Sequence, residues 1–140
     1  MPAPAHALMG RDDLAPELGT RPARVGAKPQ TRSAVMPFYC LEYAHAAALL
    51  IGPLIHRIRK HDRSLAEQIR RAAACVPSNI DEGAGFDDGR RESHYRVALG
   101  SAREVATQLR IAIAWGYIDD ATEVLDKLDR VRAMLWRLTH

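Results

Sequence analysis

Four stretches of the chain carry apolar residues at helical spacing, and short polar segments separate them. They cover about residues 41–60, 65–83, 90–115 and 119–138. Apolar residues that recur every three or four positions form one stripe on a helix, and four such stripes can close around a common core. Because the connections are short, neighbouring helices should run antiparallel. The pattern predicts an all-α protein, an up-down-up-down antiparallel four-helix bundle.

The clearest stripe lies in the third stretch. Its positions recur at spacings of four and three and are mostly small: Ala98, Ala102, Val105, Leu109, Ala112 and Gly116. Such a heptad seam lets two helix axes approach closely. We therefore expect this helix to be central to the core.

Proline and capping residues predict where the helices end or bend. Pro53 removes a backbone donor inside the first helix and should kink it or break a turn. Ser64 with Glu67 three residues later forms a capping-box pattern for the second helix, and Gly83 is the expected C-cap. Asp88 is a candidate cap for the third helix.

The N-terminal segment, residues 1–36, differs from the rest. It holds five of the eight prolines and shows no apolar periodicity, so we expect a disordered extension before a bundle domain at 37–140. It could be a basic arm that touches RNA or a partner. It could instead follow from an upstream start codon, with Met36 the true start, and we favour a segment without a specific role.

Composition limits the classes of function. The 140 residues support one domain, and the net charge is +3. Residues 1–36 carry five Lys/Arg against three Asp/Glu, which leaves fifteen against fourteen for 37–140. A bundle near +1 gives no global case for binding nucleic acid, so that case must rest on local clusters.

The cysteines and the hydropathy suggest a cytoplasmic protein. Cys40 and Cys75 are far apart and form no CxxC or Cys/His cluster, so each should pack as a small apolar residue in a reducing compartment. No apolar run approaches the roughly 18 residues that span a bilayer, and no secretory signal is evident. We expect no association with a membrane.

Basic residues gather in two places. One set surrounds the first helix connection: Arg57, Arg59, Lys60, Arg63, Arg70 and Arg71. The other repeats every seven residues on the third helix: Arg96, Arg103 and Arg110. Each set is either a solvated face with ordinary salt bridges or a surface that binds phosphates. No aromatic residues lie between the basic ones of the first set, which argues against sequence-specific readout of single strands.

Polar residues also interrupt the second and third helices. They are Ser78, Asn79, Glu82, Ser101, Glu104 and Gln108. Pro77 frees a carbonyl about four residues earlier, and such groups could satisfy it. We favour a structural hydrogen-bonded network over a pocket or an acid/base pair, because no suitably spaced histidine supports catalysis.

Self-association has its own candidates. Val97, Glu104 and Ile111 share a side of the third helix one step off the seam, so a bundle that buries only the seam would expose them. We expect them in an oligomer interface.

No enzyme motif is present. Glu42-x-x-His45 has the spacing of one di-iron ligand pair, but such sites need two of these motifs and two further carboxylates. A phosphate-binding glycine loop, GxSxG and HExxH are missing from the sequence. We therefore predict no enzyme activity, no metal, no cofactor and no small-molecule substrate.

Three segments resemble the signature of the 23S rRNA intervening-sequence protein family, over about residues 39–138. They are Arg70-Arg71-Ala72-Ala73, Pro77-x-Asn79-Ile80-Asp81-Glu82-Gly83, and Gly100-Ser101 with Glu104. Asp81 stands where a small residue is usual, and Leu41-Glu42-Tyr43 lacks the tryptophan often found there. The family is related in fold to the accessory protein of diversity-generating retroelements. The resemblance implies a four-helix bundle that forms a closed homo-oligomeric ring, commonly a pentamer, with no established activity.

The sequence thus predicts a non-enzymatic homo-oligomer with a basic surface that binds RNA or DNA. The alternative is a structural or adaptor oligomer that binds protein partners only.

Overall fold

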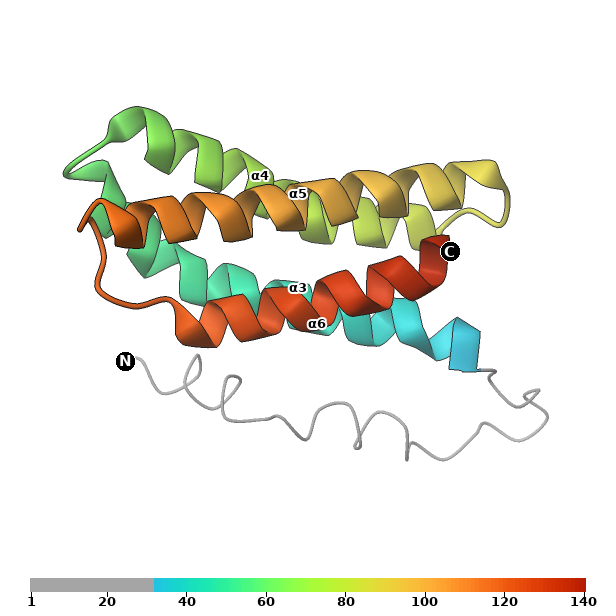
Figure 1. The fold of residues 1–140 in the computed structure, drawn as a ribbon. Coiled ribbons are helices and arrows are strands. Elements are labelled where there is room, and N and C mark those ends of the chain that lie inside the picture. The colour runs from blue at the N-terminus through green and yellow to red at the C-terminus, as the bar shows by residue number, and fades with distance from the viewer. Residues whose placement is uncertain (1–31) are drawn as a thin grey trace, which may run out of the picture.

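The computed structural model describes residues 32–140, and it places four α-helices and no strand within them. The helices are α3 (Arg32–Arg59), α4 (Arg63–Ala84), α5 (Gly89–Ala114) and α6 (Thr122–Thr139). Each helix runs back along the one before it (Figure 1). α3 and α5 each pack against both α4 and α6, which is the cyclic order of an up-down-up-down bundle. The prediction of an all-α four-helix bundle is confirmed.

The core is built from small and aliphatic side chains, as the stripe in the third stretch predicted. The seam positions of α5 that lie inside the helix are all fully buried: Ala98, Ala102, Val105, Leu109 and Ala112. Gly116 follows the helix end and has a positive φ of 76°, a conformation that suits glycine. The other helices add to the same core the buried Ile58, Ile69, Ile80, Leu128, Val131 and Leu135.

Two predicted ends of α4 are wrong. The N-cap is Asp62, whose Oδ1 accepts a hydrogen bond of 2.9 Å from the Leu65 amide, and Ser64 lies inside the first turn. Glu67 cannot complete a box with Ser64, because its carboxylate is held by Arg70 and Arg71. At the other end, Gly83 is buried inside the helix and Gly85 is the C-cap. For α5 the predicted cap is confirmed, since Asp88 Oδ1 accepts from the Arg90 amide at 2.9 Å.

α3 is longer and less interrupted than the sequence suggested. It begins at Arg32, so residues 32–36 are helical rather than part of an extension. The rest of the predicted extension, residues 1–31, lies outside the described residues. The helix also continues through Pro53 instead of breaking there. Contrary to expectation, Val35–Arg59 is long and apolar enough to cross a membrane by length and composition alone, which is a weak indication because core helices pass the same test.

The two cysteines occupy different environments. Cys40 is fully buried, its Sγ lies 3.8 Å from the Val131 carbonyl oxygen, and burial raises the pKa of its thiol to about 12. Cys75 is exposed, so the expectation that it packs as a small apolar residue is wrong. Neither forms a disulfide.

Candidate nucleic-acid interface

Four basic residues surround the connection between α3 and α4, at one end of the bundle (Figure 1). We call this set the basic end: Arg57, Arg59, Lys60 and Arg63. All four side chains are exposed, and none forms an ion pair with a carboxylate of residues 32–140. The nearby Asp62 is occupied as the cap of α4. The basic end therefore presents positive charge without a neutralising partner on the described chain.

Arg70 and Arg71, predicted to belong to the same surface, differ from the basic end. Arg70 donates two hydrogen bonds to Glu67, at 2.6 and 3.1 Å, and Arg71 donates one at 3.3 Å. These bonds, above all those from Arg70, hold the pKa of the Glu67 carboxyl at about 2. Both guanidinium groups remain exposed, so a phosphate could still reach them, but it would compete with Glu67.

Aromatic rings lie beside the basic end, which the sequence did not reveal. His61 stacks on Tyr117 with ring centroids 5.1 Å apart and planes 5° apart. Trp115 meets Tyr117 edge-on at 5.9 Å and is 62% exposed. Tyr117 and Trp115 come from the connection between α5 and α6, more than fifty positions along the chain, so only the tertiary fold brings them to the basic cluster.

Two of the three arginines of the α5 stripe lie at the border between α5 and α6. Arg96 pairs with Glu92 at 2.7 Å and also donates to the Thr139 carbonyl of α6 at 3.1 Å. Arg103 lines a groove between α5 and α6. Arg103 and Arg110 are exposed and have no ion pair within the described chain.

Four of the six predicted network residues fall into two separate groups. Asn79 Oδ1 lies 3.0 Å from His94 Nδ1, and Glu82 lies 3.9 Å from the same nitrogen. His94 is the histidine that the sequence failed to place, fifteen residues from Asn79 and on the neighbouring helix. It also stacks on Phe86, with ring planes 7° apart. This group links the last turns of α4 to the start of α5.

The second group lies further along the same pair of helices. Gln108, 7% exposed, donates to Gln68 Oε1 at 3.2 Å and to Glu104 Oε1 at 3.3 Å. Ser78 and Asn79 also donate to carbonyls of their own helix, those of Ala74 and Cys75, rather than to the one that Pro77 frees. Ser101 makes no side-chain hydrogen bond to any described residue.

The predicted interface residues lie along one exposed side of α5. Val97 is 53% exposed, Glu104 is exposed, and Ile111 is partly buried. Trp115 follows Ile111 by one helical turn and extends the same side. No group of three or more potential metal ligands occurs within residues 32–140.

Comparison with known proteins identifies the family. Residues 40–137 match the model of the family described as 23S rRNA-intervening sequence protein. No curated protein and no solved structure matches the chain.

Proposed function

The chain belongs to the family of 23S rRNA-intervening sequence proteins, and we propose that it is a non-enzymatic accessory protein that binds RNA or DNA. The observation that carries this proposal is the exposed positive charge of the basic end, which no carboxylate of the described residues neutralises. Arg70 and Arg96 are paired with glutamates, as on an ordinary solvated face, and Arg103 and Arg110, which have no ion pair among the described residues, stand seven residues apart on α5 rather than in a cluster. The four residues of the basic end have no such partners in the part of the chain described. Concentrated positive charge without counterions on the chain is the electrostatic requirement for contacting phosphates.

The aromatic rings beside the basic end add to this proposal. Phosphate contacts give affinity without sequence information, whereas exposed rings can stack on unpaired bases. The exposed Trp115 is close to the charges of the basic end through the stacked pair of Tyr117 and His61. We therefore expect binding with little dependence on base sequence.

Self-association would strengthen binding by presenting several basic ends together. We propose a closed homo-oligomeric ring, in particular a pentamer, that uses the side of α5 with Val97, Glu104 and Ile111. The half-exposed Val97 supports this interface, because an exposed apolar side chain on one side of a helix favours burial against a partner. Static light scattering should give a multiple of the monomer mass at micromolar concentration. A monomer would contradict the ring.

Binding is tested by salt-dependent gel shift with charge-reversed variants. Arg57→Glu combined with Arg63→Glu should weaken binding to RNA strongly. The matched control is Arg91→Glu with Arg137→Glu, which changes net charge equally but lies outside the basic end. Arg70→Glu with Arg71→Glu should also weaken binding, without unfolding the bundle. Affinity should fall steeply with salt, with a slope of roughly −0.7 per neutralised phosphate on single strands. Equal losses in the basic-end and control variants would contradict a localised site.

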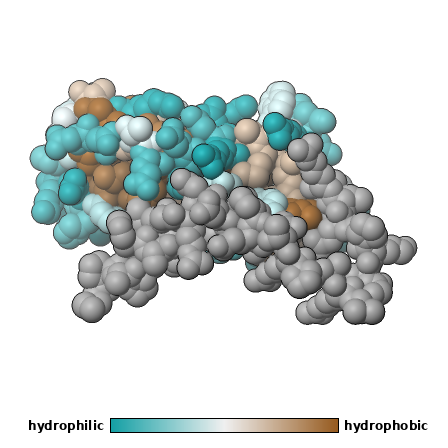
Figure 2. Space-filling view, turned by 90° about the horizontal axis from the view of Figure 1, so that it is seen from below, coloured by the Kyte–Doolittle hydropathy of each residue, from teal (hydrophilic) through white to brown (hydrophobic). Residues whose placement is uncertain are grey.

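The alternative is a structural or adaptor oligomer that binds protein partners only. Exposed apolar side chains favour it: Phe38 and Leu49 of α3 are each 44% exposed. The face seen from below likewise shows hydrophobic areas between hydrophilic ones (Figure 2). An oligomer that binds no RNA or DNA even at low salt would favour this alternative. In either case we propose a cytoplasmic location, in keeping with two free thiols.

A further inference from the structure

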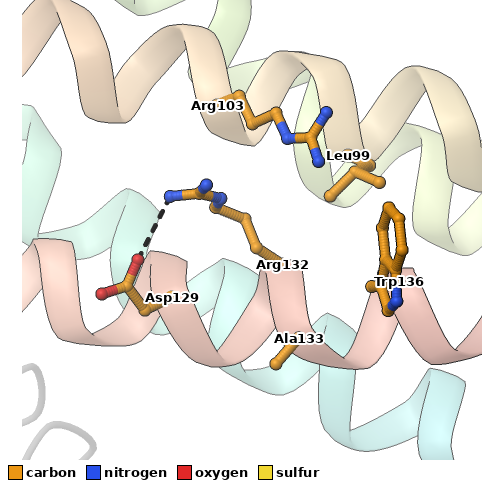
Figure 3. Close-up of a pocket in the computed structure, with 6 residues that line it drawn as sticks. All are labelled: Leu99, Arg103, Asp129, Arg132, Ala133 and Trp136. Carbon is orange, nitrogen blue, oxygen red and sulfur yellow. Dashed lines mark hydrogen bonds and ion pairs between the residues drawn. The ribbon is translucent and has the colours of Figure 1, made fainter.

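A groove runs between α5 and α6, apart from the basic end. Its volume is about 310 Å³. Six residues line it, and Figure 3 shows them: Leu99, Arg103, Asp129, Arg132, Ala133 and Trp136. Leu99 is buried, so the apolar side of the groove belongs to the core, while the small side chain of Ala133 leaves space on α6. The volume is at the lower limit for small-ligand sites, about 300 Å³, which suits one small planar group with its substituents.

An indole stands at one end of this groove. Trp136 is 49% exposed although tryptophan is the largest apolar side chain. His140 stacks on the indole, with planes 15° apart and ring centroids 3.4 Å apart. The hydrogen bond from Arg96 to the Thr139 carbonyl ties this last turn of α6 to α5. His140 therefore covers one face of the ring, and the Trp136 side chain lines the groove.

Two guanidinium groups border the groove from opposite helices (Figure 3). Arg103 of α5 is exposed and has no ion pair with the described residues. Arg132 of α6 donates to Asp129 Oδ1 at 3.2 Å. Two cations and one carboxylate leave a local charge of about +1, which matches the single negative charge of a phosphodiester. Guanidinium groups also match the geometry of phosphate oxygens.

We propose that this groove binds one unpaired nucleotide of a single-stranded RNA or DNA, with the base against Trp136 and a phosphate between Arg103 and Arg132. The proposal rests on the proposed function and adds a second contact to it, one that requires an accessible base face. Bases within a duplex are stacked on each other and cannot reach the indole. The groove thus favours single strands, whereas the basic end alone would accept either form.

Tryptophan fluorescence tests the proposal directly. The chain has two tryptophans, so Trp115→Phe leaves Trp136 as the only one. Titration with a single-stranded RNA oligonucleotide should quench Trp136 emission, and a duplex of the same length should not. Unchanged emission at RNA concentrations that saturate a gel shift would overturn the proposal.

Affinity measurements provide a second test. Trp136→Ala should weaken single-strand binding roughly 5- to 150-fold, as expected for losing one stacked base, and leave duplex binding unchanged. Trp136→Phe should retain most of the affinity because it keeps an aromatic face. Arg103→Glu should weaken single-strand binding more than Arg91→Glu, which makes the same charge change on the same helix outside the groove. If Trp136→Ala does not fold, the comparison of Arg103→Glu with Arg91→Glu and the fluorescence titration still test the groove proposal.

The outcomes separate the two proposals. If the basic-end variants lose RNA binding while Trp136→Ala and Arg103→Glu bind single strands normally, the groove proposal fails and the proposed function stands. If the wild-type protein binds neither single strands nor duplexes, both fail.

Discussion

Gly83 of α4 lies against the ring of Tyr95 of α5. A Cβ atom at residue 83 would be 2.8 Å from Tyr95 Cε1, 2.9 Å from Tyr95 Cδ1 and 3.0 Å from His94 Cβ. Tyr95 is 1% exposed, so its ring is enclosed by the core and cannot simply move aside. Glycine is therefore required at residue 83 for the close approach of two helices, not for a turn.

Gly83→Ala should destabilise the bundle. Alanine favours a helix over glycine by about 1 kcal/mol, but overpacking a core typically costs about 1–3 kcal/mol. Because the contact is with an enclosed ring and a backbone-proximal carbon, we expect overpacking to outweigh the gain in helix propensity. The free energy of unfolding should fall by about 1 kcal/mol. Urea denaturation followed by circular dichroism would measure it.

The matched control is Gly100→Ala on α5. No atom lies within 4 Å of a Cβ at residue 100, so only the helix-propensity gain applies. This variant should be more stable than the wild type by about 1 kcal/mol. A Gly83→Ala protein more stable than the wild type would contradict this prediction, because it would show that α4 and α5 can move apart without loss of stability.

The four-helix bundle could be predicted from the sequence, because the apolar residues that form its core recur at regular helical spacing. The seam of α5 from Ala98 to Ala112 repeats at helical spacing, and each of these positions is buried in the fold. The roles of residues that interrupt this apolar repeat could not be predicted in the same way. Gly83 has the sequence signature of a helix end, and only the position of Tyr95 on another helix shows its actual role.

The first turn of α4 gives a second prediction. Two residues of the same segment, Asp62 and Ser64, are both good N-caps in sequence, but only Asp62 accepts a bond from a free amide of the first turn, that of Leu65. Asp62→Ala should therefore cost about 0.5–2 kcal/mol, whereas Asp62→Asn should cost little. Thermal melting of the three proteins would measure the difference.

Ser64→Ala is the discriminating control for this cap. The Ser64 hydroxyl only accepts an exposed bond of 3.2 Å from Gln68, so its removal should change stability by less than about 0.5 kcal/mol. A larger loss for Ser64→Ala than for Asp62→Ala would restore the capping box that the sequence suggested.

The candidate site was only partly predictable, for a physical reason. Clusters such as Arg57 to Arg63 are close in sequence and stay close on adjoining turns. Their neighbours Trp115 and Tyr117 arrive from another connection, and Trp136 reaches its groove from the last helix. Contacts of this kind depend on which helices and helix ends lie side by side in the fold. The apolar repeat within one helix does not contain that information.

The two thiols should react at very different rates. Cys75 is exposed, whereas Cys40 is buried and its raised pKa, about 12, keeps it protonated at neutral pH. Since the thiolate is the reactive form, a disulfide reagent should label one thiol quickly in the native protein and the second only on unfolding. In Cys75→Ser no rapid phase should remain. Rapid labelling of Cys40 in that variant would contradict the packing of α3 against α6.

Glu67 provides a prediction on pH that also reports on binding. Its carboxyl pKa is lowered from 4.5 to about 2, chiefly by the hydrogen bonds from Arg70 and secondarily by Arg71. A lowered pKa in the folded state means that the pairing stabilises the fold above about pH 4.5, and that this contribution is lost as the pH falls toward 2. The contribution to stability should be small because the pair is exposed to solvent.

NMR titration of the Glu67 carboxyl carbon should therefore give a midpoint near 2 in the wild type. Arg70→Ala should move the midpoint toward 4.5, and Arg71→Ala should move it less, because Arg70 donates the two shorter bonds. A wild-type midpoint already near 4.5 would mean that the ion pairs do not persist in solution. If phosphates draw Arg70 and Arg71 away from Glu67, saturating RNA should raise the midpoint, whereas RNA held by the basic end alone should leave it unchanged.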